Sequence, residues 1–342
     1  MKIHSTNGPT PARRGFTLVE LLTVIVIISI LAGLVTVAAL SAIKGAKRAT
    51  ISSEITQLSM ALQKYKDERG DYPPDFCGLN TTVYPTAVVT NMQTAILRHL
   101  RRAFPKYTPG VTTTSPKLTG WAGFQADVFA GSGNTLDVNN MTPDAALVFW
   151  LGGMPDTAGS AKLNSFSANP ANPFALGGTR LPAYFEFDEV RLTRDATTNT
   201  YRYVPPHVTS PDGAVGAENV APYVYFQARS KEYLIRRAAP AAAWIKTYQP
   251  TSIPGVGTAC PYARENATPA DFATVKWFEP EKFQIICCGL DGIYLNPAAT
   301  IVATNPAHVR YVAEEQNNLT TEEDDNQASF TQGSLGDWSE GK

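Results

Sequence analysis

The sequence predicts an α+β fold in which one long amino-terminal helix packs against a head built on an antiparallel sheet. Two observations support this prediction. Residues 17–43 are an apolar run with one ionisable side chain, Glu20, and no proline interrupts residues 16–69. Later in the chain, short runs of aromatic and β-branched residues are separated by turn residues, which is typical of antiparallel strands.

The overall charge gives no electrostatic reason to expect a nucleic-acid partner. The chain has 29 basic and 30 acidic residues. Residues 1–15 contain three basic residues and no acid, so the remainder has 26 basic and 30 acidic residues. Nucleic-acid-binding domains usually carry a basic excess, and this chain has none. A content of 44% hydrophobic and 17% charged residues fits a packed globular body.

The apolar run has the length and the flanking charges of a membrane helix. Residues 17–43 exceed the roughly 20 residues that cross a bilayer core. Two arginines come shortly before the run, and three basic residues follow it, Lys44, Lys47 and Arg48. Gly15 stands between the arginines and the run. A cut after Gly15 would therefore remove the leading charges and keep the helix, unlike cleavage of an ordinary secretory signal.

Residues 13–20, Arg-Arg-Gly-Phe-Thr-Leu-Val-Glu, resemble the signature of type IV prepilins. The resemblance implies cleavage after Gly15 by a membrane prepilin peptidase, followed by N-methylation of Phe16. It also makes Glu20 the fifth residue of the mature chain, the position at which the family carries its glutamate. The fold that it implies is pilin-like, with the long hydrophobic helix packed on the sheet of the head.

The chemistry of Glu20 agrees with an assembly role. A carboxylate inside hydrocarbon costs about 2.5–3.5 kcal/mol. Cleavage would create a positive amine at Phe16, and pairing with that amine on a neighbouring subunit would offset the cost and set the axial register. The alternative is a plain membrane anchor in which Glu20 reaches up to the interface.

We expect four segments along the chain. They are a leader at 1–15, a membrane-spanning assembly helix at 16–43, an amphipathic continuation at 44–70, and an extracytoplasmic head at 71–342 with a flexible acidic carboxy-terminal tail. The continuation shows apolar residues at helical period, namely Ile51, Ile55, Leu58, Leu62 and Tyr65. The protein is then a single-pass protein of the inner membrane, with its head in the periplasm or outside the cell.

Within the head, local patterns predict two further helices and several strands. One helix is expected at 86–104, and a second begins at Thr142 and closes at Gly152 and Gly153. Strands are expected at 183–187, 201–204, 223–228 and 283–288. Residues 110–120, 155–180 and 238–271 are expected to be loops, the last two being insertions of unassigned role.

Two parts of the head resemble the major pseudopilins of type II secretion. Residues 64–73 resemble their helix-to-loop junction, and residues 283–292 are similar to their late strand with its Gly-x-Asp-Gly turn. In that family an acidic loop follows and completes a calcium site. The acidic match here is 322–326, so the resemblance implies Asp291, Asp324 and Asp325 as calcium ligands. About 30 residues separate the two parts, and a solvated acidic loop is the alternative.

The four cysteines permit more than one interpretation. A disulfide between Cys77 and Cys260 is allowed outside the cytoplasm, and buried free thiols are the alternative. Cys287 and Cys288 are adjacent in a predicted strand, where neighbouring side chains point to opposite faces. No cysteine or histidine spacing indicates zinc.

No catalytic motif accompanies these features. The four histidines are scattered, and the chain has no HExxH, GxSxG, Walker or GxGxxG arrangement. Asp188 and Glu189 are adjacent acids, but in a strand they would point to opposite faces. We therefore expect a structural subunit and not an enzyme.

The leading hypothesis is a pseudopilin that assembles from the inner membrane into a type II secretion-like filament and helps to drive protein export. The alternative is a type IV pilin subunit of a surface pilus that serves adhesion, motility or DNA uptake. The acidic match at Asp291, Asp324 and Asp325 and the junction at 70–73 favour the first. Expected partners are other pilin or pseudopilin subunits, the prepilin peptidase, the assembly platform and the membrane.

Overall fold

The computed structural model describes residues 16–339, except for residues 81–83, 114–115, 156–161, 196–197, 209–215, 237–242, 251, 265–270, 300, 313–318 and 332. The expected leader at 1–15, including Gly15, lies outside the described residues. The chain divides into two compact units, Met1–Ala46 and Lys47–Lys342.

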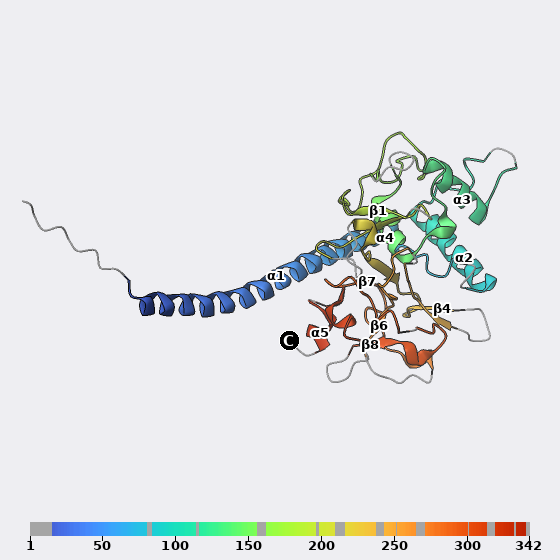
Figure 1. The fold of residues 1–342 in the computed structure, drawn as a ribbon. Coiled ribbons are helices and arrows are strands. Elements are labelled where there is room, and N and C mark those ends of the chain that lie inside the picture. The colour runs from blue at the N-terminus through green and yellow to red at the C-terminus, as the bar shows by residue number, and fades with distance from the viewer. Residues whose placement is uncertain are drawn as a thin grey trace, which may run out of the picture. The chain divides into compact units, whose positions relative to one another are not determined.

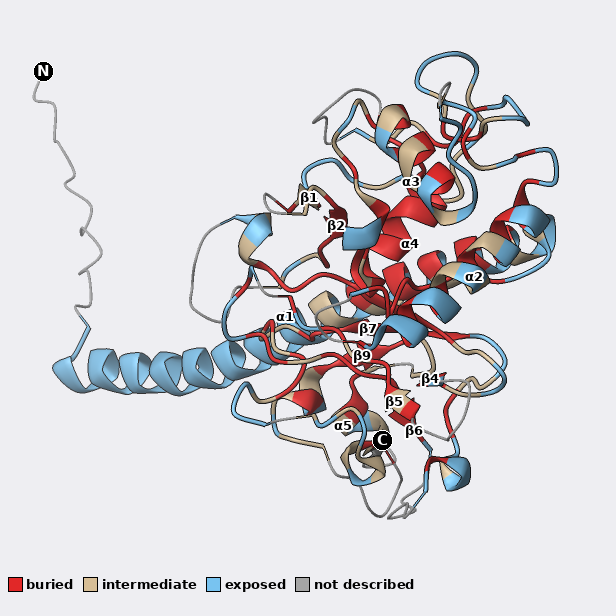
Figure 2. Cartoon of the chain, turned by 90° about the vertical axis from the view of Figure 1, so that its right-hand side faces the viewer, coloured by how far each residue is buried: buried red, intermediate tan, exposed pale blue. Residues whose placement is uncertain are grey.

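The predicted long helix is present as α1, Leu18–Arg69 (Figure 1). In the first unit, its side chains are all exposed, as the blue ribbon in Figure 2 shows. One 18-residue window of the helix has a mean hydropathy of 2.8, so α1 is apolar and long enough to cross a membrane. Such a continuous apolar surface needs lipid or other helices to cover it.

In the second unit, the end of α1 contributes to the core of the head. The five apolar residues at helical period, Ile51 to Tyr65, are all buried. Gly70 ends the helix with φ +84°, a left-handed conformation that glycine adopts without strain. Its N–H donates to the carbonyl of Lys66.

Three more helices form one part of the head. They are α2 (Thr86–Ala103), α3 (Gly120–Gly131) and α4 (Pro143–Gly152). Every residue of α4 is buried, and Figure 2 shows it in red at the centre of the head. The predictions for α2 and α4 are confirmed within one residue. Helix α3 was not predicted, because its glycine-rich sequence lacks an amphipathic pattern and is stabilised by tertiary packing.

The central sheet is antiparallel, as predicted. It has the order β3-β7-β9, formed by Val224–Gln227, Phe283–Cys287 and Gln327–Ala328. Val224 pairs with Ile286, and Ile286 pairs in turn with Ala328. Both flanking strands thus depend on β7, whose five residues are all buried.

Smaller strand pairs surround this sheet. The antiparallel pairs are β1 (Leu192–Arg194) with β2 (Tyr201–Tyr203), and β4 (Leu234–Arg236) with β5 (Ala243–Ile245). Strands β6 (Tyr262–Ala263) and β8 (Arg310–Tyr311) pair in parallel. Short 3-10 turns occur at Val138–Asn140, Ala217–Asn219, Phe272–Thr274, Pro306–His308 and Glu323–Asp325, and the last helix is α5, Leu335–Ser339.

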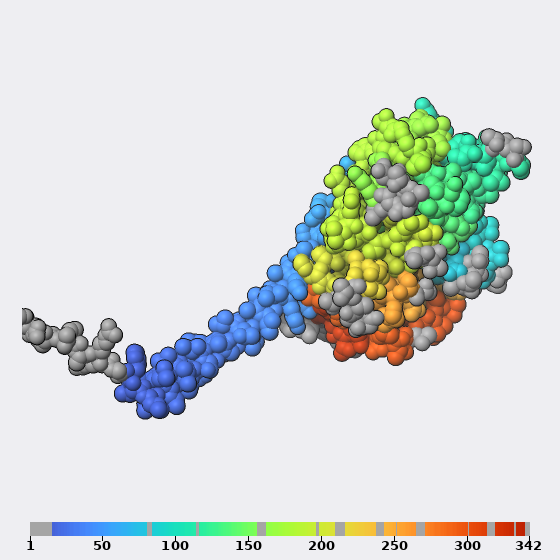
Figure 3. Space-filling view, turned by 45° about the horizontal axis from the view of Figure 1, so that its top comes forward, coloured from blue at the N-terminus to red at the C-terminus, as the bar shows by residue number. Residues whose placement is uncertain are grey.

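Within the head, the helices and the late strands lie on opposite sides of the sheet. Figure 1 shows α2, α3 and α4 on one side of β7 and β6, β8 and α5 on the other. The space-filling view in Figure 3 shows the same division, with the middle of the chain in green and the last third in orange and red.

Three predictions for the head were wrong. Residues 183–187 form no strand. Their aromatic rings pack on the core, and the ring centroids of Phe187 and Tyr203 are 4.8 Å apart. The segment 155–180 is more than surface loop, because Phe166 and Phe174 are buried. The acidic carboxy-terminal segment, expected to be a flexible tail, packs into the head through β9 and the buried Leu335. In each case, packing against residues distant in sequence overrides the local pattern.

The four cysteines are free and buried. Burial raises the pKa of the Cys77 thiol to about 12, and its sulfur lies 3.6 Å from the carbonyl oxygen of Thr247. The Cys77 thiol is therefore protonated, and the four buried cysteines pack as small apolar groups.

Candidate functional site

The start of α1 holds Glu20 in a defined arrangement. The backbone N–H and the hydroxyl of Thr17 each donate to Glu20 Oε2 over 2.8 Å. The N–H of Glu20 donates back to the Thr17 hydroxyl over 3.2 Å. Because α1 begins at Leu18, Thr17 is the N-cap and Glu20 the third helical residue, which makes this pair a capping box.

Two of the predicted site residues, Phe16 and Glu20, lie at this start of α1. Phe16 precedes the cap and is 84% exposed. The carboxylate of Glu20 is satisfied by its own helix end, so the isolated chain does not leave it without hydrogen bonds. The Thr-x-x-Glu pattern of residues 17–20 is a signal in the sequence for this capping box, in addition to the assembly role predicted for Glu20.

The structure also brings together the two parts of the predicted calcium site. The N–H of Leu290, in the turn that follows β7, donates to Asp325 Oδ2 over 2.5 Å. Gly289 has φ +68°, and a Cβ there would lie 2.5 Å from the carbonyl oxygen of Asp325. The 30-residue separation in sequence is therefore closed in space, and glycine is required for the contact.

The carboxylates in this place already have partners. Asp325 Oδ1 accepts from the Arg48 guanidinium of α1, with Nε at 2.8 Å. Asp291 Oδ1 accepts from the N–H of Ile293 over 2.9 Å. Burial, together with the charges of Asp325 and Glu322, raises the pKa of Asp291 to about 6.

As placed, these residues do not form an open site for a calcium ion. Among the residues that the structure describes, no three acidic, histidine or cysteine side chains are grouped to hold a metal. Calcium needs six to eight oxygen ligands, whereas the oxygens of Asp325 are bonded to a cation and to a backbone N–H. The arrangement acts instead as a clasp that joins Arg48 of α1 to the acidic segment.

A second polar cluster joins α1 to the head, and the sequence analysis missed it. Glu54 accepts from Arg191 Nη1 over 2.9 Å, from the hydroxyl of Tyr203 over 3.0 Å and from that of Tyr223 over 2.8 Å. Glu54 lies in the buried face of α1. A polar residue within an otherwise apolar stripe was the one available signal.

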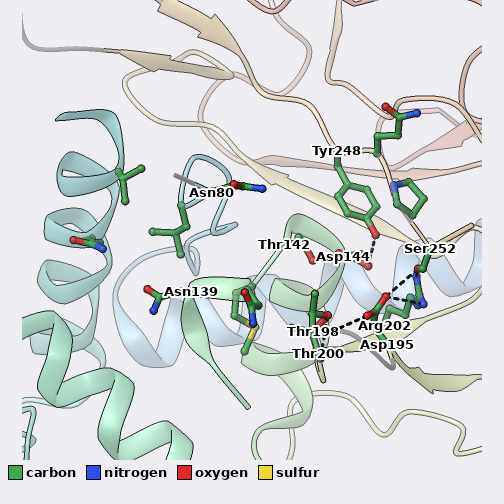
Figure 4. Close-up of a pocket in the computed structure, with 17 residues that line it drawn as sticks. Asn80, Asn139, Thr142, Asp144, Asp195, Thr198, Thr200, Arg202, Tyr248 and Ser252 are labelled. Carbon is green, nitrogen blue, oxygen red and sulfur yellow. Dashed lines mark hydrogen bonds and ion pairs between the residues drawn. The ribbon is translucent and has the colours of Figure 1, made fainter. Parts of the chain in front are cut away.

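A cavity of about 530 Å³ in the head is lined mainly by polar side chains (Figure 4). The charged side chains of this cavity have partners within the protein. Arg202 lies 3.2 Å from Asp195, which also accepts from Ser252, and the Tyr248 hydroxyl donates to the buried Asp144 over 2.7 Å. These contacts serve structure, and they do not form a nucleophile with an adjacent base.

The adjacent acids considered in the sequence analysis do not form a catalytic pair. Asp188 and Glu189 lie at an exposed turn, and Asp188 Oδ2 is 3.4 Å from Arg191 Nε.

Comparison with known proteins gives one match. Residues 10–36 match the model of the prokaryotic N-terminal methylation motif, which is the signature of type IV pilins and pseudopilins. No curated protein and no solved structure is significantly similar to the chain. The motif includes Phe16 and Glu20 and covers the start of the exposed apolar half of α1.

Proposed function

We propose that this chain is a structural filament subunit of the pilin and pseudopilin kind, cleaved after Gly15 and assembled from the membrane through α1. The observation that supports the proposal most directly is the methylation motif at residues 10–36, placed at the start of a helix whose first half is apolar and exposed. A soluble globular enzyme would not expose such an apolar surface, whereas a filament subunit buries it both before and after assembly. Lipid covers it before assembly, and sister helices cover it afterwards.

Assembly would exchange one set of contacts of Glu20 for another. In the membrane pool, the capping box satisfies the carboxylate. In the filament, the methylated amine of Phe16 on a neighbouring subunit would pair with it and fix the axial register. The exchange costs little, because a hydrogen-bonded carboxylate is replaced by an ion-paired one in the same apolar layer.

Within this class, we favour a pseudopilin of a type II secretion-like system. The support is the sequence likeness of residues 64–73 and 283–292 to the major pseudopilins, and the approach of the acidic segment to the turn at 289–292. Growth of a short filament in the periplasm would then push cargo through an outer-membrane pore. The second candidate is a subunit of a type IV surface pilus, which the same methylation motif also fits.

The proposal implies partners and a place in the cell. The partners are other pilin or pseudopilin subunits, the prepilin peptidase and the inner-membrane assembly platform. The head would lie in the periplasm or outside the cell. Calcium binding by Asp291, Asp324 and Asp325 stays a prediction.

The mature amino terminus tests the proposal. Mass spectrometry of the protein purified from membranes should find a chain that begins at N-methylated Phe16. Changing Gly15→Leu should give the uncut chain from Met1, since a bulky residue replaces the small one at the cut. A wild-type chain that keeps its two leading arginines would overturn the proposal.

A further inference from the structure

A smaller cavity of about 250 Å³ lies between α2, the segment after α1 and the residues that follow β3. Arg98 and Arg102 of α2 line it together with Arg229, and Asp71 and His99 complete its polar wall. The cavity lies entirely within the head. It is separate from the capping box, from the acidic segment and from the cavity of Figure 4.

Positive charge in this cavity exceeds negative charge. Asp71 is the one carboxylate in the lining, and it lies 3.6 Å from Arg102. Among the residues that the structure describes, neither Arg98 nor Arg229 has a carboxylate within ion-pair distance. Three arginines against one aspartate leave a formal excess of two positive charges.

Arg229 is the most buried of the three arginines. Its side chain is half-buried, and its Nη1 contacts the sulfur of Met92 at 3.6 Å, which is a weak acceptor. Burial lowers the pKa of Arg229 and the charge of Arg98 adds to this effect, whereas the charges of Asp75 and Asp71 act in the opposite direction. A guanidinium withdrawn from water needs a partner to offset the lost hydration.

His99 adds no charge to the cavity. Its Nε2 shares a hydrogen bond of 2.8 Å with the Tyr65 hydroxyl. Burial, followed by the charges of Arg102 and Arg69, lowers the pKa of His99 to about 3, so the ring is neutral near pH 7. The histidine therefore also experiences the positive potential of this region.

The contrast with the larger cavity shows what is missing. There, Arg202 is matched by Asp195 and Ser252 within the protein. In the smaller cavity, no described carboxylate forms an ion pair with Arg98 or Arg229. Three guanidinium groups line the smaller cavity, and the described lining residues supply one carboxylate to balance them.

We propose that this basic cavity binds a dianionic oxyanion group, a phosphate or a sulfate. Guanidinium groups bind such oxygens in bidentate fashion, and the excess of two positive charges equals the charge of the ligand. The cavity is smaller than a typical site for a drug-sized ligand, which suits a single tetrahedral group. The group could come as the free ion or on a larger organic molecule.

Isothermal titration calorimetry on the full-length mature protein in nonionic detergent tests the inference. The ligands are sodium phosphate, glucose 6-phosphate and glucose. Both phosphate compounds should bind, and glucose should not. Equal affinities would identify the free ion as sufficient, whereas at least tenfold tighter binding of glucose 6-phosphate would show that the site takes an organic monoester. Absence of binding by both phosphate compounds would overturn the inference.

Variants separate this cavity from general surface charge. Arg229→Gln and Arg98→Gln should each weaken phosphate binding about tenfold, as expected for the loss of one charge-assisted contact. Arg101→Gln is the matched control, because Arg101 lies exposed on the same helix outside the lining, and it should change the affinity less than twofold. Equal losses for all three variants would indicate diffuse attraction and contradict the inference.

Thermal unfolding gives a second readout. Phosphate should raise the melting temperature of the wild-type chain, since a ligand that binds the folded state stabilises it. At the same phosphate concentration, it should raise the melting temperature of Arg229→Gln by a smaller amount. If Arg229→Gln does not fold, the exposed Arg98 decides the question through its own variant. These outcomes do not depend on the proposed filament function.

Discussion

At the scale of single residues, Glu20 has two competing partners. In the isolated chain, its carboxylate accepts two hydrogen bonds from Thr17. In a filament, the amine at Phe16 of a neighbour would take their place. The capping box therefore satisfies the carboxylate of Glu20 in the isolated chain, and in the proposed filament a stronger, charge-assisted ion pair would replace it.

Glu20→Ala should leave the protein in the membrane and impair filament assembly. The apolar helix alone is long enough for insertion, whereas the change removes the group that pairs with the neighbouring amine. Membrane fractionation and electron microscopy of sheared filaments measure the two effects. Thr17→Val is the control: it removes both cap hydrogen bonds of the Thr17 hydroxyl, a loss of about 1 kcal/mol, and keeps the charge, so filaments should persist. Normal assembly of the Glu20→Ala chain would refute the pairing role.

A fully buried ion pair holds the centre of the head. Lys246 Nζ lies 2.5 Å from Asp75 Oδ2 and from the Gln227 carbonyl oxygen, and both charged side chains are 0% exposed. Asp75 also accepts from the N–H of Gln227 in β3. The pair thus ties the segment after α1 to the central sheet.

Lys246→Met should lower the free energy of unfolding by about 3–5 kcal/mol, because it leaves Asp75 buried without its counter-charge. Urea denaturation followed by circular dichroism measures the loss. Lys231→Met is the matched control: Lys231 pairs with Glu281 at 3.1 Å, but its side chain is 74% exposed. That change should cost less than about 0.5 kcal/mol. A similar loss in both variants would contradict the account of the buried pair.

At the scale of elements, α1 performs two tasks along one continuous helix. Its first half has no core contacts, while the residues from Ile51 to Tyr65 belong to the core of the head. Two polar contacts reinforce the second half, namely Arg48 with Asp325 and Glu54 with Arg191. These pairs join α1 to the carboxy-terminal segment and to Arg191, the residue before β1.

Arg48→Ala should lower the free energy of unfolding by about 1 kcal/mol, because the pair with Asp325 is partly exposed to solvent. Thermal unfolding measures this loss, and Lys47→Ala, at the neighbouring position, serves as the control. The expected change for Lys47→Ala is smaller, since no ion pair to a carboxylate within the described residues involves Lys47.

Chelation tests the predicted calcium site on the same segment. If Asp291, Asp324 and Asp325 bind calcium after Arg48 is displaced, a chelator should lower the melting temperature of the purified protein. Asp291→Ala and Asp325→Ala should each abolish that response. A melting temperature that does not change on chelation, together with a loss in Arg48→Ala, would show that the clasp alone organises the segment.

At the scale of the whole molecule, the two candidate systems differ in what the filament does. A pseudopilin acts in a short filament that moves other proteins, whereas a pilin builds the surface appendage itself. Deleting the gene should therefore stop export of proteins across the outer membrane and leave surface pili in place. Culture supernatants and electron microscopy of cells measure the two outcomes. The wild-type gene, but not the Glu20→Ala gene, should restore export. Loss of pili with intact export would favour the alternative.

The sequence by itself determined the parts of the protein that obey local rules. The position of α1, its end at Gly70 and the methylation motif with Phe16 and Glu20 follow from apolar periodicity, turn chemistry and a short pattern. Strands β3 and β7 also follow, because alternating aromatic and β-branched residues indicate strands wherever they pair.

Only the tertiary structure decided which distant residues meet. Residues 183–187, expected to be a strand, form a packed loop. Asp325 contacts Leu290 and Arg48, and Arg98 and Arg229 line one cavity. The physical reason is that these contacts join segments separated by tens to hundreds of residues. Their free energy comes from burial and charge pairing in the assembled head, and no local pattern records it.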